Sequence, residues 1–132
     1  MTTKPSGRPA VSPDGRHVAS TYREVGEPAF SIGVYPLDGG GESVKRIKPL
    51  AGAQLFVPVR WSDDGESVVY VVRNGGVDNL WAQRIEGAGR ARQFTHFPSG
   101  YIYAFDISPR DGRVALARGG RNSYVVLLTE VR

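Results

Sequence analysis

The 132-residue sequence contains no cysteine, which excludes a disulfide framework, a thiolate metal site and a cysteine nucleophile. It has no apolar stretch long enough to cross a bilayer, so we expect no membrane partner. It also lacks a sustained 3.6-residue apolar period, which would indicate amphipathic helices. Turn formers are abundant instead, with 17 glycines and 9 prolines, and this composition favours an all-β chain of short strands.

The motifs that most often mark catalytic sites are missing as well. The chain has no G-x-S-x-G nucleophile elbow, no H-E-x-x-H metal pair and no phosphate-binding glycine loop ending in Lys-Ser or Lys-Thr. His17 begins a predicted strand and His96 follows a strand-ending threonine, so ordinary structural roles explain both. We therefore predict no catalytic residue, no metal and no cofactor, and a protein that is not an enzyme.

The net charge of +4 comes from basic residues that are spread along the chain. Such spreading is typical of solvated strand faces, whereas a nucleic-acid groove needs a concentrated basic surface, so we expect no nucleic-acid partner. The opening residues, MTTKPSGRP, lack the apolar core of a signal peptide. The compartment stays open between periplasm and cytoplasm, because the absence of cysteine permits either.

One pattern recurs three times: a short apolar strand, a Ser-x-Asp-Gly turn, which Arg110 lengthens by one residue in the third copy, and a second strand. It reads VSPDGRHVA from Val11, WSDDGESVV from Trp61 and ISPRDGRVA from Ile107. The serines of the three copies are 50 and 46 residues apart. Recurrence at this interval is typical of a β-propeller built from blades of four antiparallel strands.

We predict a flexible lead-in over residues 1–7 and three propeller blades over 8–132. Blade one spans 8–47, blade two 55–95 and blade three 101–129, the last without its outer strand. In blade two the run from Val68 to Val72 is apolar at every position. A strand with that pattern is buried on both faces, as a middle strand between two other blades must be.

Each turn places an aspartate before a glycine, and the predicted structural residues of the repeat are Asp14, Gly15, Asp64, Gly65, Asp111 and Gly112. Aspartate hydrogen-bonds its own backbone in such turns and glycine accepts a positive φ. Recurring aspartates would also suit calcium, but turn chemistry explains them without a metal.

Phe56 and the other aromatics that fall on predicted strands are expected, for the most part, to pack between blades. Tyr101 and Tyr103 are predicted to lie near the mouth of the ring, which makes them the candidate interaction residues.

At Trp61–Gly65, and in related form at Val11–Gly15 and Ile107–Gly112, the sequence resembles the TolB-type family of β-propellers with WD-like repeats. Asn79-Leu80-Trp81 and Arg92–Thr95 are similar to that family's third and closing strands. The last repeat also resembles the C-terminal propeller blades of bacterial serine/threonine kinases and winged-helix regulators. The resemblance implies a non-catalytic propeller scaffold that binds a protein or peptide.

The family has six or more blades in one chain, and this sequence has three. Open end blades would expose apolar faces, which normally mark an interface. We therefore expect a homodimer in which two copies close a six-bladed ring. The partner's residues 2–5 are one candidate for the outer strand that blade three lacks. The alternative function is an accessory or sensor propeller of a larger enzyme, either a serine peptidase or a serine/threonine kinase, and both natural-fragment and engineered origins stay open.

Overall fold

The computed structural model describes residues 3–5, 8–37, 44–86, 90–120 and 124–130, and its regular structure there is entirely β-strand. No helix in this part of the chain has the length and hydrophobicity to span a membrane. Blade one contains β1 (Thr3–Pro5), β2 (Ala10–Val11), β3 (His17–Glu24), β4 (Ser31–Pro36) and β5 (Lys45–Ile47). Blade two contains β6 (Arg60–Trp61), β7 (Ser67–Asn74), β8 (Val77–Arg84) and β9 (Ala91–Gln93), and blade three contains β10 (Tyr101–Ile107), β11 (Arg113–Gly119) and β12 (Tyr124–Glu130).

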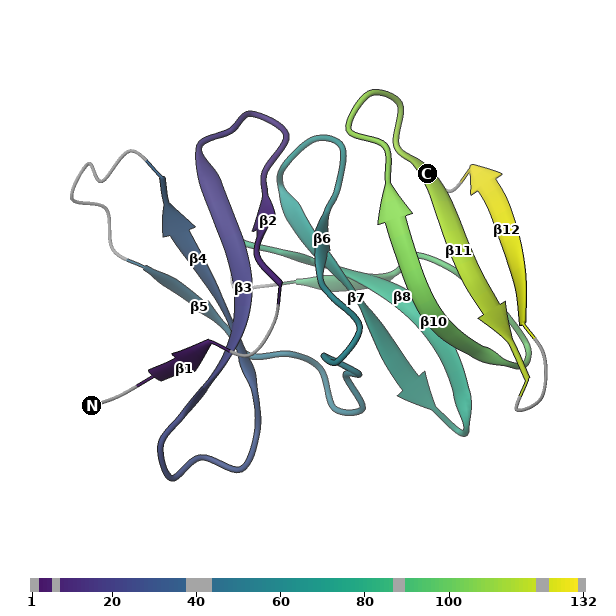
Figure 1. Ribbon diagram of the computed structural model, residues 1–132, viewed down its shortest axis with the longest axis horizontal. Coiled ribbons are helices and arrows are strands. Elements are labelled where there is room, and N and C mark those ends of the chain that lie inside the picture. The colour runs from purple at the N-terminus through teal and green to yellow at the C-terminus, as the bar shows by residue number, and fades with distance from the viewer. Residues whose placement is uncertain (1–2, 6–7, 38–43, 87–89, 121–123, 131–132) are drawn as a thin grey trace.

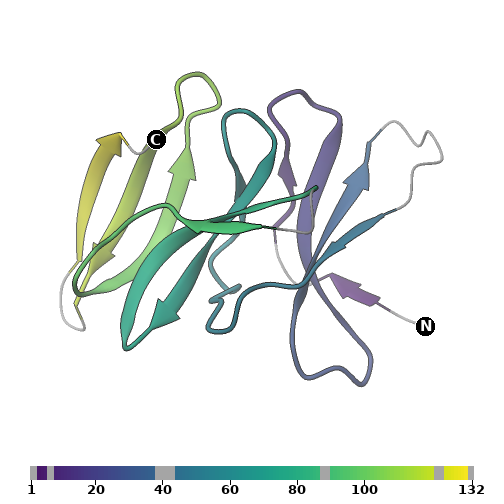
Figure 2. The same cartoon turned by 180° about the vertical axis from the view of Figure 1, so that it is seen from behind.

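The three sheets are antiparallel and follow one another in a row, with blade one and β12 at opposite ends (Figure 1). The prediction of all-β propeller blades is confirmed. Strands β2, β6 and β10 come first in the repeats and contact one another from blade to blade. The Ser-x-Asp-Gly turns that follow them lie along one edge of the molecule in both views (Figures 1 and 2). We call this the turn edge, and the opposite side the loop edge.

Residues 3–5 form a strand, which differs from the flexible lead-in predicted over 1–7. Thr3 pairs with Glu24 and Pro5 with Tyr22. Strands β1 and β2 therefore pair with the same edge of β3, β1 near its end and β2 near its start. Backbone hydrogen bonds to the edge of β3 hold β1, and such pairing needs no apolar pattern that the sequence would reveal. Residues 1–2 and 6–7 lie outside the described residues.

The first strand of every blade is interrupted. In blade two Ala53 bridges Val72 and β6 pairs only with Val68 and Val69. Between these contacts the segment 55–59 has no ladder pairing, although Val57 and Val59 within it are buried in the two core layers. Blade two was predicted to begin with a strand at Leu55, but ladder pairing starts at Arg60. Pro58 within this segment has no N–H to give to a ladder. In blade three a single residue, Tyr103, is left over in the register with β11.

Strand β7 is buried on both faces, as its apolar run predicted. Val69 and Val71 belong to the core cluster shared with blade three. Val68, Tyr70 and Val72 belong to the cluster shared with blade one. All five side chains are between 0% and 5% exposed. The core of the molecule is therefore two apolar layers, one on each side of blade two.

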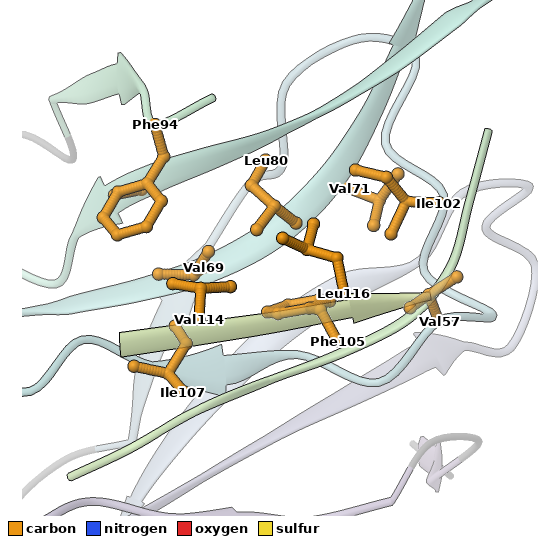
Figure 3. Packing of buried hydrophobic residues seen from close by; sticks show 11 residues of the cluster. Val57, Val69, Val71, Leu80, Phe94, Ile102, Phe105, Ile107, Val114 and Leu116 are labelled. Carbon is orange, nitrogen blue, oxygen red and sulfur yellow. The ribbon is translucent and has the colours of Figure 1, made fainter. Parts of the chain in front are cut away.

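Leu80 of β8 and Leu116 of β11 meet in the layer between blades two and three (Figure 3). Strand β10 adds Phe105 to the same layer, and β9 is followed there by Phe94. Because these side chains come from three strands of two sheets and from the residue that follows β9, losing one of them loosens the contact between blades as well as the blade itself.

We expect Leu80→Ala to lower the free energy of unfolding by about 2–5 kcal/mol, because it removes a fully buried side chain and leaves a cavity. Leu37→Ala, the same substitution at a side chain that is 51% exposed, should change it by no more than about 0.5 kcal/mol. Urea unfolding of both variants at one protein concentration measures the difference. Equal losses would contradict the assignment of Leu80 to the interblade core.

Candidate functional site

The turns at the turn edge are closed by the aspartate that the repeat places there. In blade one Ser12 Oγ donates to Asp14 Oδ1 over 2.6 Å, and the backbone N–H of Arg16 donates to the same oxygen over 3.0 Å. In blade two Ser62 Oγ donates to Asp64 Oδ1 over 2.6 Å. These carboxylates therefore accept hydrogen bonds from groups of their own turns.

The third turn accommodates an inserted arginine with the same chemistry. The N–H of Arg113 donates to Asp111 Oδ1 over 3.1 Å. Gly15, Gly65 and Gly112 all have φ between 73° and 75°, which glycine adopts without strain. Among the described residues no group of three or more His, Asp or Glu side chains could hold a metal ion.

These hydrogen bonds lower the pKa of all three turn carboxyls. For Asp14 and Asp64 the largest cause is the serine hydroxyl, and for Asp111 it is the backbone N–H of Arg113. Each bond favours the charged form of the carboxyl.

The turns also touch from blade to blade. A Cβ on Gly65 would lie 3.7 Å from Cδ of Pro13, the second residue of the preceding turn. A Cβ on Gly112 would lie 2.8 Å from a carboxylate oxygen of Asp63, which has the same place in blade two. A Cβ on Gly15 would meet nothing within 4 Å. Gly15 is thus the one of these three turn glycines that has no residue of a preceding turn against it.

The position before the turn serine shows the same asymmetry. Val11, Trp61 and Ile107 pair with Val18, Val68 and Val114 and are therefore equivalent. Trp61 is 5% exposed and Ile107 is 8% exposed, because each packs against the preceding blade, whereas Val11 is 58% exposed. Trp61 also donates its indole N–H to the carbonyl oxygen of Ala10 over 2.7 Å.

Val11 belongs to one face of blade one, which we call the open face: Val11, Val18, Ser20, Tyr22, Gly33 and Tyr35. The hydroxyl of Tyr35 lies 2.7 Å from where a Cβ on Gly33 would be, so the ring covers this glycine. Burial raises the pKa of Tyr35. The guanidinium of Arg46 lies 6.0 Å from the ring centroid of Tyr22. The open face is therefore a mixture of aromatic rings and small residues, and at one side it also carries the ion pair of Arg46 with Glu24 over 2.6 Å.

Tyr101 and Tyr103 lie at the start of β10, on the loop edge. The ring of Tyr101 is stacked under the guanidinium of Arg73, 4.7 Å from its centroid. Arg73 in turn binds Asp78, a fully buried carboxylate that also accepts the N–H of Ile102 over 2.9 Å. Tyr101 is thus held by a structural cluster.

Tyr103 is 43% exposed, and its hydroxyl donates to the carbonyl of Gly120. The structure keeps Tyr103 at the surface of the loop edge, where it stays a candidate contact for a ligand.

Two hollows were not anticipated from the sequence. A groove of about 550 Å³ on the loop edge runs between Phe30 and Phe56, which are 38% and 74% exposed. Phe56 was one of the strand aromatics of which most were expected to pack between blades, but its side chain is exposed in a segment, 55–59, that makes no ladder pairs. In the sequence, Pro58 was the residue that could have indicated the break in ladder pairing next to Phe56. On the turn edge a cleft of about 860 Å³ lies between blades two and three, where Arg84, Arg92 and Arg110 face Asp64 and Asp111.

The chain was compared with known proteins, and no family model matches it. It is 32% identical over 101 residues to the Tol-Pal system protein TolB of Anaeromyxobacter dehalogenans. The matched part is 76% of this chain and 20% of that relative, so the chain spans about a fifth of its length.

Three solved structures have the same fold. TolB from Acinetobacter baumannii superposes with a TM-score of 0.74 at 23% identity, over 96% of this chain and 30% of that one. A putative TolB from Agrobacterium tumefaciens gives 0.65 at 17% identity, over 98% and 46%. The AtxE2 isopeptidase gives 0.56 at 20% identity, over 87% and 21%.

The lowered pKa values of the turn aspartates predict a pH dependence. A carboxyl whose pKa is lower in the folded state stabilises the fold above its unfolded pKa of about 4. That contribution is lost as the pH falls through the folded value. In the triple variant Asp14→Asn, Asp64→Asn and Asp111→Asn the turns keep a hydrogen-bonding side chain but lose the titration.

The triple variant should therefore lose less unfolding free energy than the wild type between pH 6 and pH 3, measured by urea unfolding. Equal losses in the two proteins would show that these turns do not set the acid response.

Proposed function

This chain consists of blades of the TolB-type β-propeller family, and we propose that it is a non-catalytic protein-interaction module that self-associates into a six-bladed ring. The family assignment and the propeller fold support the interaction role. The function of a propeller resides in the loops and faces that it presents, since the fold itself is shared by many activities. Membership of the Tol-Pal system is a property of the Anaeromyxobacter dehalogenans relative, and the proposal for this chain does not include it.

The exposure of Val11 is the observation that supports self-association most directly. Its two equivalents in the chain are buried by the preceding blade, and Val11 has the same register in the same kind of sheet. Burying one valine fully is worth roughly 1.5–3 kcal/mol, and Val11 lies on a face that also carries the partly exposed Tyr35. A second blade over this face would be favoured for the same reason that blades pack inside the chain.

Two copies suffice for closure. Each supplies three blades, and six lies within the usual range of about four to eight for propellers. A head-to-tail contact closes into a ring when its rotation divides the circle evenly, as a twofold arrangement of half-rings does.

An accessory propeller of a larger enzyme is the second candidate. The fold similarity to the AtxE2 isopeptidase favours it, since that enzyme contains comparable blades. The coding sequence on either side of this chain discriminates between the two functions, because an accessory propeller would be joined to a catalytic domain.

Light scattering across a dilution series tests self-association. We expect a mass of twice the chain's 14.3 kDa that persists on dilution, because a closed ring buries two interblade contacts at once. A mass of 14.3 kDa at every concentration would refute the ring, and a mass that keeps rising with concentration would indicate open chains of copies instead.

A further inference from the structure

The contact that would join two copies can be specified from the contacts that join blades within one copy. We infer that the open face of blade one packs against the outer face of blade three from a second copy. This inference rests on the proposed self-association. In this arrangement Asp106 lies beside Val11, and Pro109 lies over Gly15. The inference names both surfaces of the interface and their register.

Two kinds of contact recur at both blade junctions within the chain. The first links inner strands: Trp61 donates to the carbonyl of Ala10 at one junction, and Arg60 Nε donates to the carbonyl of Phe105 over 3.2 Å at the other. The second links turns, where Pro13 or Asp63 lies against the glycine of the next turn. The turn contact uses the same places in the repeat at both junctions. The inner-strand bond involves the equivalent residues Ala10 and Arg60 of the preceding blade, but Ala10 accepts and Arg60 donates.

The positions that take part in these contacts are unoccupied at the two ends of the row of blades. On blade one they are Val11, which is 58% exposed, and Gly15, which has open space over it. On blade three they are the backbone carbonyl of Asp106, whose side chain is 75% exposed and forms an ion pair with Arg60 over 3.5 Å, and Pro109, which is also exposed. Asp106 is equivalent to Ala10, and Pro109 to Pro13. Placing the two ends together completes both contacts.

The two end faces also match in size. Register places Ala104, Ala115 and Ala117 on the outer face of blade three, opposite the side that Phe105 and Leu116 bury against blade two. Between blades one and two, small residues already meet aromatic ones: Ala10 and Ala19 lie in one cluster with Trp61 and Tyr70. The alanines of blade three would meet Val11 and Tyr35 of the open face in the same way, since Tyr22 is already buried within its own copy at 5% exposure.

A second copy is the occupant that the structure favours, because one chain supplies both complementary faces. A twofold ring uses each face once and leaves neither exposed. A contact of blade one with blade one would instead set aromatic rings against aromatic rings and leave the alanine face of blade three uncovered.

Val11→Trp tests the register by gain of binding. The new indole N–H would reach the carbonyl of Asp106 in the second copy, as Trp61 reaches Ala10. One added hydrogen bond with further apolar burial should lower the dissociation constant of the dimer about tenfold. The matched control is Val25→Trp, at a valine that is 71% exposed but outside the open face, and it should leave the constant unchanged. An unchanged or weaker dimer for Val11→Trp overturns the inference.

Cysteine cross-linking tests the pairing of faces, since the native chain has no cysteine. With a short bis-maleimide, the double variant Val11→Cys and Asp106→Cys should give a covalent dimer on a denaturing gel, and each single variant should stay monomeric. Cross-linking of Val11→Cys alone would mean blade one against blade one and would overturn the inference.

The two proposals fail in different ways. A wild-type dimer by light scattering without a cross-link in the double variant overturns the register but leaves self-association standing. A wild-type monomer overturns both, because no second copy then covers the open face.

Discussion

The packing of one sheet face on the next is the interaction on which the rest of this structure depends. Blade two is apolar on both sides, and β7 gives alternate residues to the two layers, Val69 and Val71 to one and Val68 and Tyr70 to the other. Since adjacent residues of a strand point to opposite faces, an unbroken apolar run is the sequence that a central blade requires. A blade taken alone would leave at least one of these layers in water.

Interruption of the inner strands follows from the same arrangement. The short ladders of β2 and β6 hold the apolar residues in register next to the turns, while the residues between ladder segments make no ladder pairs, although Val57 and Val59 among them stay buried. At the loop edge this places Phe56 and Tyr103 at the surface, although the strands beside them are buried. Surface contacts and core packing are thus separated along a single strand.

Because the repeat occurs three times, the contacts that the open face of blade one lacks can be identified by comparison with the equivalent positions of blades two and three. Trp61 and Ile107 show how much of the position before the turn serine a neighbouring blade covers, and Val11 shows the same position uncovered. Gly65 and Gly112 show the turn contact made, and Gly15 shows it absent. The proposed ring adds no new kind of contact, because it repeats at the ends what the chain already does twice in its interior.

The sequence by itself determined the features that rest on local chemistry: the order of the blades, the Asp-Gly turns with their positive φ, and the two-sided burial of β7. Tertiary structure decided the rest. Whether Val11, Trp61 or Ile107 is buried depends on the presence of a preceding blade, which no local pattern encodes. The pairing of β1 with β3 needs only backbone groups, and the exposure of Phe56 follows from ladder bonds that its segment does not make. A side chain on a blade face is buried only when a second sheet packs over it, so its burial is determined by the assembly of the two sheets.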